Sequence, residues 1–425
     1  MRLALPRRGW FCLMVALAGG GPAIAAEQVA GLRAPEGFAV SLFADETLTP
    51  DAIRLTVDRQ GRIVVSGPGY IRILCDDDGD GRAERAEDFS TEPRGGAMGL
   101  LWEGDTLYYV GQGPDGPGGL RRLTDANHDD RADGPSKLIR AVKASGEHDA
   151  HALRRGPDGW LYLLCGNHAG IDASWSEGPT SPIHEPVAGC LVRLSPDLQT
   201  SEIVADGFRN AYGMDFNDDG EWFTFDSDNE RCVSLPWYEP TRFYHVVPGG
   251  HYGWRSPQRA VFWRLPPYLP DVVAPAATLG RGSPTGVACY RHRQFPARYH
   301  GGFFVLDWTF GRVEFLTLTR SGSTYEARPE IFLKSIGENG FAPTDLLVHP
   351  QTGDLYVSIG GRGTRGAVYR VRYEGKALGV EEGSELEQGS GFRVPGSASV
   401  DGTANRSPPW TSLDWRSAAK DECLA

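Results

Sequence analysis

The chain has 425 residues, of which 55 are glycine and 30 are proline, and 40% are hydrophobic. This length exceeds what one small core requires and suits a large repeat fold or two ordinary domains, while the apolar runs argue against a disordered chain. The formal charge of −12 argues against a nucleic-acid partner, because phosphate binding requires a basic surface, and against electrostatic docking on anionic lipid.

The first 26 residues have the pattern of a secretory signal peptide. Three arginines occur among the first eight residues, an apolar run covers residues 10–17, and Ala-Ile-Ala-Ala at 23–26 provides a cleavage site of the A-x-A type. The apolar run is too short to cross a bilayer, and no later segment is suited to it either. We therefore expect a mature protein that is periplasmic or secreted and has no membrane span.

A turn followed by an apolar strand recurs six times after this signal. Each turn contains glycine, which tolerates positive φ, and each following run is rich in aromatic or β-branched residues, as a half-buried strand requires. Their spacing of roughly 45 to 80 residues leaves room for a four-stranded sheet and a variable loop. The six turns occupy residues 58–61, 103–105, 157–159, 217–220, 299–302 and 351–353.

One such sheet cannot cover both of its faces, so the sheets must stack around an axis. The repeat predicts an all-β fold, a six-bladed β-propeller over residues 27–373, and a β-sandwich with long insertions is the structural alternative. Residues 374–425 are rich in Gly, Ser, Glu and Pro, which predicts a disordered tail or the remnant of a linker.

The strongest local motif is an acidic loop at residues 76–81, with the sequence Asp-Asp-Asp-Gly-Asp-Gly. Asp76, Asp78 and Asp80 stand at alternate positions and can direct their oxygens at one centre, while Glu87 occupies the twelfth position of an EF-hand-like loop. The pattern predicts a calcium site, with strands rather than helices on either side of it.

A second acidic loop follows one blade later. Asp125, Asn127 and Asp129 repeat the alternate spacing, and Asp130 stands where the first loop has a glycine. Calcium is predicted here too, and solvated acidic turns are the alternative for both loops. Either ion would join blade edges and take no part in chemistry.

Seven cysteines occur in the chain, and six of them follow the predicted signal. None forms a C-x-x-C pair, so neither c-type haem attachment nor a zinc ribbon is supported. Cys165 and Cys190 are the nearest candidates for a disulfide in an oxidising compartment, and buried free thiols are the alternative.

Three polar clusters lie beside the predicted strands, at residues 147–151, 207–213 and 225–230. Loops on one face of a propeller converge at its axis, so side chains far apart in the sequence can share one pocket. We expect these clusters to form the candidate active site.

The order of these motifs resembles the glucose/sorbosone dehydrogenase superfamily, which includes the soluble quinoprotein sugar dehydrogenases. The motifs are His148, Gly-Pro-Asp-Gly at 156–159, Gly-Phe-Arg-Asn at 207–210, the acidic run at 225–230 and Tyr-Gly-Trp at 252–254. Residues 207–230 with Ser-Pro-Thr-Gly at 283–286 resemble more narrowly the propeller module of membrane-bound dehydrogenases abundant in planctomycete-type bacteria.

The resemblance implies a propeller that binds pyrroloquinoline quinone (PQQ) over its axis beside calcium and oxidises a sugar or alcohol. His148 matches the general base that takes the hydroxyl proton as hydride leaves for the quinone, a role suited to an imidazole that titrates near neutral pH. Glu147 matches an acidic residue that would orient His148.

The same resemblance assigns four further residues. Arg209 matches the arginine that contacts the quinone oxygens and would stabilise negative charge, and Asn210 matches its cofactor-binding neighbour. Asp226 and Asp228 match the segment that supplies oxygens to calcium, which polarises the quinone.

Two cationic positions of that family are absent from this sequence. Residues 307–312 lack the lysine expected near the quinone carboxylates, and residues 341–345 stand where the family has a pair of arginines. A tricarboxylate needs several cations, and Arg362 and Arg365 in the next loop could supply them.

The site residues also have simpler interpretations. His148 could be a hydrogen-bonded structural residue, and Arg209 could tie blade loops together by pairing with an acidic residue of the 226–230 run. His148, Asp149 and His151 are close enough in sequence to suggest a transition-metal site instead.

The sequence thus supports two hypotheses about function. One is an exported sugar or alcohol dehydrogenase with calcium and a quinone, which would need a separate electron acceptor because the chain shows no cytochrome c motif. The other is a non-catalytic, calcium-stabilised propeller that binds carbohydrate or protein on its loop face.

Overall fold

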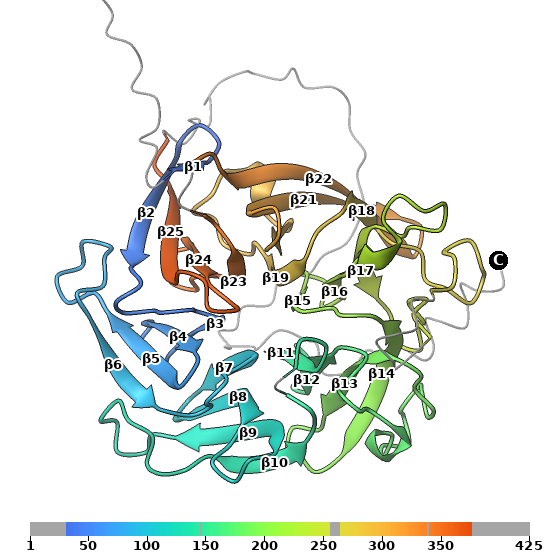
Figure 1. Cartoon of the computed structure of the whole chain (residues 1–425), viewed down its shortest axis with the longest axis horizontal. Helices are drawn as coiled ribbons and strands as arrows, with labels where there is room; N and C mark the ends of the chain where they lie inside the picture. Colours follow the sequence, from blue (N-terminus) through green and yellow to red (C-terminus); the bar gives the residue numbers. More distant parts are fainter. Residues whose placement is uncertain (1–30, 145, 256–263, 338–339, 376–425) are drawn as a thin grey trace, which may run out of the picture.

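Six antiparallel sheets surround a central axis in the computed structural model of the chain (Figure 1). The structure describes residues 31–144, 146–255, 264–337 and 340–375. The all-β, six-bladed β-propeller predicted from the repeat is therefore confirmed. The predicted signal segment and nearly all of the predicted tail lie outside the described residues.

Each sheet is one blade, and in blades 1 to 4 the strands follow one another in the chain from the axis outwards (Figure 1). Blades 1 to 3 contain β3 (Arg54–Val57), β4 (Ile63–Gly67), β5 (Tyr70–Cys75) and β6 (Arg85–Ser90); β7 (Gly99–Glu103), β8 (Thr106–Gln112), β9 (Gly118–Thr124) and β10 (Lys137–Ala141); and β11 (Ala150–Arg155), β12 (Leu161–Cys165), β13 (Gly189–Leu194) and β14 (Ser201–Phe208).

Blades 4 to 6 continue the same order. They contain β15 (Met214–Phe216), β16 (Trp222–Asp226), β17 (Thr241–Val246) and β18 (Ala277–Gly280); β19 (Pro284–Cys289), β20 (Phe303–Asp307), β21 (Arg312–Ser321) and β22 (Thr324–Ser335); and β23 (Pro343–Val348), β24 (Leu355–Ile359) and β25 (Ala367–Tyr373). In the connections between the described strands lie the one-turn 3-10 helices η2 (Ala173–Trp175), η3 (Glu230–Cys232) and η4 (Ala297–Tyr299).

The six predicted turns all lie between the first and second strands of a blade. A glycine in each turn adopts positive φ, for example 87° at Gly61 and 79° at Gly159, where a side chain would be strained. The second strands β12, β16, β20 and β24 are buried along their whole length, because each one packs between two neighbouring blades.

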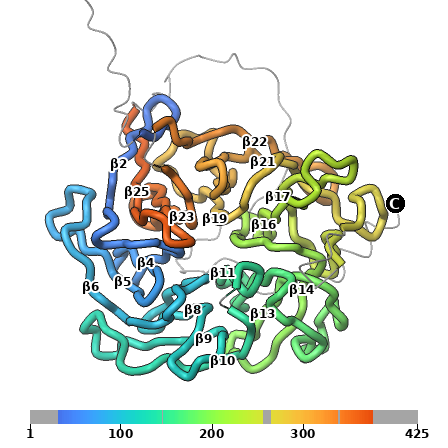
Figure 2. Tube along the Cα trace, in the orientation of Figure 1, coloured from blue at the N-terminus to red at the C-terminus, as the bar shows by residue number. Residues whose placement is uncertain are grey.

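The ring is closed by the segment that precedes the first blade. Strand β2 (Phe38–Ala44) forms the outer edge of blade 6 by pairing with β25, and Figure 2 shows the blue β2 beside the orange-red β25. The short β1 (Leu32–Arg33) adds a fifth strand to blade 5 by pairing with β22. This closure was not predicted from the sequence, because the pairing joins segments more than three hundred residues apart.

Phe38 on β2 packs against several aromatic rings at this junction. Its ring makes edge-on contacts with Phe295, Tyr299, Phe332 and Tyr373, with ring centroids 4.7 to 5.3 Å apart. Each such aromatic pair contributes about 0.5–1.5 kcal/mol beyond the burial of its apolar area. The contacts fasten the closing strand to blade 5 as well as to blade 6.

The cysteines among the described residues are buried free thiols. Cys165 and Cys190 lie directly opposite each other on β12 and β13, yet they are not joined. Burial raises the pKa of both thiols, so neither is reactive as a thiolate in this state.

Candidate active site

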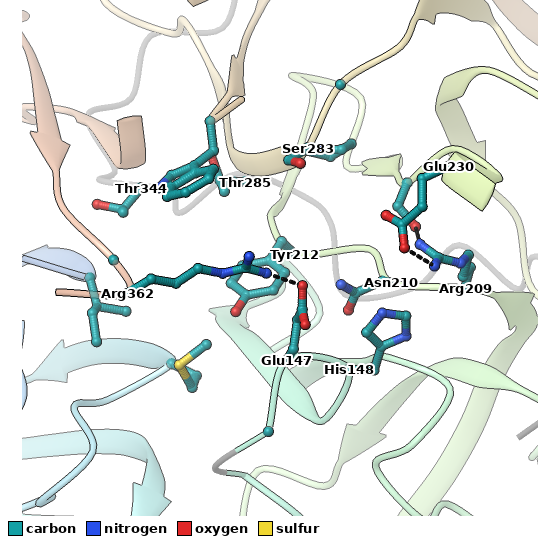
Figure 3. A pocket seen from close by; sticks show the side chains of 18 residues that line it. Glu147, His148, Arg209, Asn210, Tyr212, Glu230, Ser283, Thr285, Thr344 and Arg362 are labelled. Atoms are coloured by element: carbon teal, nitrogen blue, oxygen red, sulfur yellow. Dashed lines mark hydrogen bonds and ion pairs between the residues drawn. The ribbon is translucent and has the colours of Figure 1, made fainter. Parts of the chain in front are cut away.

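A pocket of about 310 Å³ lies at the propeller axis on one face (Figure 3). Its walls come from the loops that lead into the first strand of each blade and from the loops that follow several second strands, so all six blades contribute. Glu147, His148, Arg209 and Asn210 line it, which brings together residues that the sequence places more than sixty positions apart.

His148 lies in the loop just before β11, where its side chain is only 7% exposed. Its Nδ1 lies 2.6 Å from Asn167 Oδ1, and its ring stacks on His168 with centroids 4.8 Å apart. Burial lowers the pKa of His148 to about 4, aided by the positive charge of Arg209 and opposed by the bond to Asn167. The imidazole is therefore neutral near pH 7, and the bond from Nδ1–H to Asn167 leaves the lone pair on Nε2.

Glu147 does not orient His148 as the resemblance implied. Its carboxylate pairs with the guanidinium of Arg362 across the pocket (Figure 3). That guanidinium also lies 5.4 Å from the ring centre of Trp308. Asn167 holds His148 instead. Nothing in the sequence distinguishes Asn167 from other loop amides, and only its place directly after β12 could have suggested it.

Arg209 and Asn210 follow β14, and neighbouring side chains fix both of them by hydrogen bonds. Arg209 donates from Nη1 to Ser227 Oγ at 2.9 Å and from Nη2 to Glu230 Oε1 at 3.1 Å. The pairing with Glu230 is the one that the simpler interpretation of Arg209 anticipated. Asn210 Oδ1 lies 3.0 Å from Nε2 of the fully buried His151.

Asp226 and Asp228 do not line the pocket. The Asp226 carboxylate is fully buried and accepts hydrogen bonds from the backbone N–H groups of Arg209 (3.0 Å) and Asn210 (2.7 Å), and from Arg264 Nη2 (2.7 Å). Asp228 accepts from the Tyr238 hydroxyl at 2.8 Å, and burial raises its pKa. Asp226 therefore shapes the Arg209–Asn210 segment, and its occupied oxygens do not offer a vacant ligand set for calcium at the axis.

The suggested transition-metal cluster is not assembled either. Asp149 accepts a hydrogen bond from the backbone N–H of Gly146, His148 is bound to Asn167, and His151 is bound to Asn210. The three side chains face different partners.

The acidic loop between β5 and β6 does bring carboxylates together. Ligand oxygens of Asp76, Asp78, Asp80 and Glu84 lie within 4.8 Å of one another, and this is the single group of its kind found in the described ranges. Glu87 is not part of it, because residues from Arg85 onward form β6 and the Glu87 carboxylate pairs with Arg85. Glu84, at the ninth position, takes the place predicted for Glu87.

The second acidic loop, between β9 and β10, follows the same backbone path. His128 and Asp130 have φ of 60° and 67°, where the first loop has Gly79 at 77° and Gly81 at 90°. Asp125, however, accepts from Arg59 Nη1 at 3.1 Å. In the same loop, the Asp130 oxygens bind both terminal nitrogens of Arg62, at 2.6 and 2.7 Å. Arginines of blade 1 thus occupy this loop where the first loop gathers carboxylates.

Residues 25–358 match the family described as "Domain of unknown function (DUF7133)". The chain belongs to this family. No curated protein matches it in sequence.

Solved structures with the same fold include several sugar dehydrogenases. The PQQ-bound aldose sugar dehydrogenase of Streptomyces coelicolor is 18% identical (TM-score 0.54), covering 80% of this chain and 100% of that one. The holo pyranose dehydrogenase PQQ domain of Coprinopsis cinerea is 14% identical (0.57), covering 80% and 97%. The apo-form soluble aldose sugar dehydrogenase of Escherichia coli is 16% identical (0.51), covering 79% and 99%. The chain therefore has the propeller fold of the quinoprotein sugar dehydrogenases.

The pocket lining of this DUF7133 chain is poorly matched to PQQ in electrostatic terms. Its cationic side chains among the described residues are Arg209 and Arg362, and each is already paired with a glutamate of the same lining, Glu230 or Glu147. Trp308 and Thr344 line the pocket at the two segments where the family has cations. A tricarboxylate would meet a lining with no net positive charge, so the residues present do not fit this cofactor as they stand.

Arg362 and Arg365 differ in their position. Arg362 reaches the pocket, as suggested from the sequence, whereas Arg365 donates to the Tyr369 hydroxyl at 3.0 Å and does not line it. One of the two compensating cations is therefore in place.

Proposed function

We propose that the axial pocket is the active site of a dehydrogenase that oxidises a hydroxyl group of a small sugar or alcohol. The observation that carries this proposal is His148, a neutral imidazole whose Nδ1 is bound by Asn167 and whose Nε2 retains its lone pair. It lines a pocket large enough for a monosaccharide-sized molecule. The fold shared with sugar dehydrogenases supports the same reaction class.

The chemistry assigned to this chain's residues is proton transfer and charge stabilisation. Oxidation of an alcohol removes a proton from oxygen and a hydride from carbon. His148 takes the proton, and Arg209 and Asn210 are placed to donate hydrogen bonds to the oxygen. The hydride passes to a two-electron acceptor of the quinone class supplied from outside the chain, which is reduced to the hydroquinone, and a separate electron carrier would then reoxidise that hydroquinone.

A dye-reduction assay tests this function. The purified protein is incubated with aldoses and simple alcohols in the presence of an artificial electron acceptor, in three arms: with PQQ and calcium, with calcium alone, and with neither. Substrate-dependent dye reduction in any arm supports the dehydrogenase. Reduction confined to the PQQ arm would show that the arginine pairs open to admit the quinone, and the absence of reduction in all arms would reject the proposal.

A second function is favoured by the charge balance of the pocket. The Arg209–Glu230 and Arg362–Glu147 pairs present both donors and acceptors to a neutral polyol, which suits binding without oxidation. Under this alternative, calorimetry detects carbohydrate binding while all three arms of the dye assay remain inactive.

Export to the periplasm or the exterior is proposed from the signal pattern of the first 26 residues. The described part of the chain contains no helix with the length and apolar character that a membrane span requires.

Calcium is proposed at the loop formed by Asp76, Asp78, Asp80 and Glu84. A ligand that binds only the folded state stabilises it by about 2.7 kcal/mol at a hundred times its Kd. Calcium is therefore expected to raise the melting temperature, and EGTA to reverse the increase. Asp80→Asn should abolish most of the calcium-dependent increment. Asp129→Asn, at the equivalent place in the second loop, should leave it unchanged, and equal losses in both variants would refute the assignment.

A further inference from the structure

Behind the pocket, two hydrogen bonds join a buried side chain to a side chain that lines the pocket. Asn167 holds the ring of His148, and His151 holds the amide of Asn210. His148 and Asn210 lie side by side at the pocket (Figure 3). Each of these two side chains can present either a hydrogen-bond donor or a hydrogen-bond acceptor to a ligand, depending on how it is held.

The proton of His151 can be placed by elimination. The side chain is completely buried, and this burial keeps its pKa well below the ordinary value, so the ring carries a single proton. Nε2 faces Asn210 at 3.0 Å, whereas Nδ1 has no hydrogen-bond partner within the ranges that the structure describes. A buried N–H without an acceptor is rarer and more costly than a buried lone pair without a donor. The proton therefore resides on Nε2, and Asn210 Oδ1 accepts it.

The backbone behind Asn210 shows which end of the amide lies against the wall of the pocket. A Cβ built on Gly166 would come within 2.9 Å of Asn210 Oδ1, so the amide oxygen faces the wall of the pocket. The ring of His151 is also fixed, because it stacks on Tyr212 with centroids 3.7 Å apart. With Oδ1 turned inward, the Nδ2 amino group of Asn210 is the part left for a ligand.

We infer that His151 and Asn167 are positioning residues that together set the polarity of the pocket, with Asn210 as a hydrogen-bond donor and His148 as a hydrogen-bond acceptor. A donor beside an acceptor matches a single C–OH group. The hydroxyl O–H donates to His148 Nε2, and its oxygen accepts from Asn210 Nδ2. An ether oxygen or an ammonium group satisfies one member of the pair and leaves the other unpaired.

Histidine tautomers measured by NMR test this inference without any substrate. The chain has ten histidines, so protein labelled with ¹⁵N-histidine gives few ring signals, and His148→Gln and His151→Gln variants assign the two that matter. The expected result near pH 7 is His151 protonated on Nε2 and His148 protonated on Nδ1. The opposite tautomer at either ring overturns the inference.

Kinetics test the consequence for catalysis, and this part rests on the proposed function. His151→Phe retains a ring over Tyr212 but cannot donate to Asn210, and kcat is expected to fall about 10²-fold with a smaller change in KM. His151→Gln places an amide N–H near the same point and should recover most of the loss. His245→Phe, a buried and stacked histidine on β17 outside the pocket, is the matched control and should retain wild-type turnover.

The two proposals fail in different ways. If the wild type shows no turnover but the tautomers are as expected, the dehydrogenase is rejected and the polarity of the pocket stands. If the wild type is active and His151→Phe has unchanged kcat, the positioning role of His151 is rejected and the dehydrogenase stands.

Discussion

Replacing His148 by alanine is expected to lower kcat by a factor of about 10²–10⁴, the range that a positioned general base contributes. The loss follows because no other neutral imidazole lines the pocket within the described residues. The loss of kcat is measured by stopped-flow or steady-state dye reduction with the most active substrate from the initial screen. His349→Ala is the control, since this histidine is also buried but bonds to the backbone of Gly61 away from the pocket. Equal activities of the two variants would remove His148 from the mechanism.

The pH dependence gives the same prediction a second test. His148 must be neutral to accept a proton, and its pKa in the folded protein is about 4 rather than 6.5. The acidic limb of kcat/KM is therefore expected near pH 4. In the unfolded chain the same imidazole takes up a proton below pH 6.5, so the free energy of unfolding should decrease as the pH falls from 6.5 to 4. His148→Ala should make that decrease shallower.

Replacing Asp226 by alanine is expected to destabilise the fold by about 3–5 kcal/mol, the cost of removing one partner of a buried ion pair. The change leaves the Arg264 guanidinium and the backbone N–H groups of Arg209 and Asn210 without their acceptor in a site that excludes water. Urea unfolding followed by tryptophan fluorescence measures the loss. Turnover should fall as well, because the Arg209–Asn210 segment loses the group that shapes it.

Asp228→Asn provides the comparison for Asp226. Its carboxylate accepts a hydrogen bond from the Tyr238 hydroxyl, and an amide oxygen can keep that bond. The expected cost is about 1 kcal/mol or less. If Asp226→Ala were no more destabilising than Asp228→Asn, the structural role given to Asp226 would be wrong.

The blades could be predicted from the sequence because their signals are local. A glycine turn and the apolar strand that follows it lie within about ten residues, and each of the six units repeats this pattern. Ring closure could not be predicted in the same way. Strand β2 pairs with β25 through backbone hydrogen bonds, and backbone bonds leave no distinctive residue in the sequence.

The residues of the site were predicted in part, and the wrong assignments have physical causes. The resemblance identified Glu147, His148, Arg209 and Asn210, and all four line the pocket. It gave Asp226 a ligand role, although in the fold this carboxylate faces the backbone of the neighbouring loop.

Asn167, which holds His148 from behind the pocket, could not be predicted, because its contact depends on how the loop after β12 folds back. Asn167 reaches His148 only because the chain returns after β12, and this return depends on tertiary packing. The EF-hand spacing predicted Glu87, not Glu84, because it places the last ligand at the twelfth position, which in an EF-hand belongs to the helix after the loop. In a hairpin, the strand begins too early for the twelfth residue to turn back.

The closing strand also fixes the order in which the ring can be completed. Strand β2 is synthesised before the first blade, and its partner β25 is the last strand of the sixth blade, so β2 can pair only when that last blade has been made and folded beside it. Until then, Phe38 and the free edge of β25 remain exposed to solvent and to other chains. The same arrangement makes Phe38 and Tyr373 neighbours in one sheet. A circularly permuted chain, joined at this point and opened in a loop between two other blades, would form the closing hairpin locally and should refold faster than the natural order.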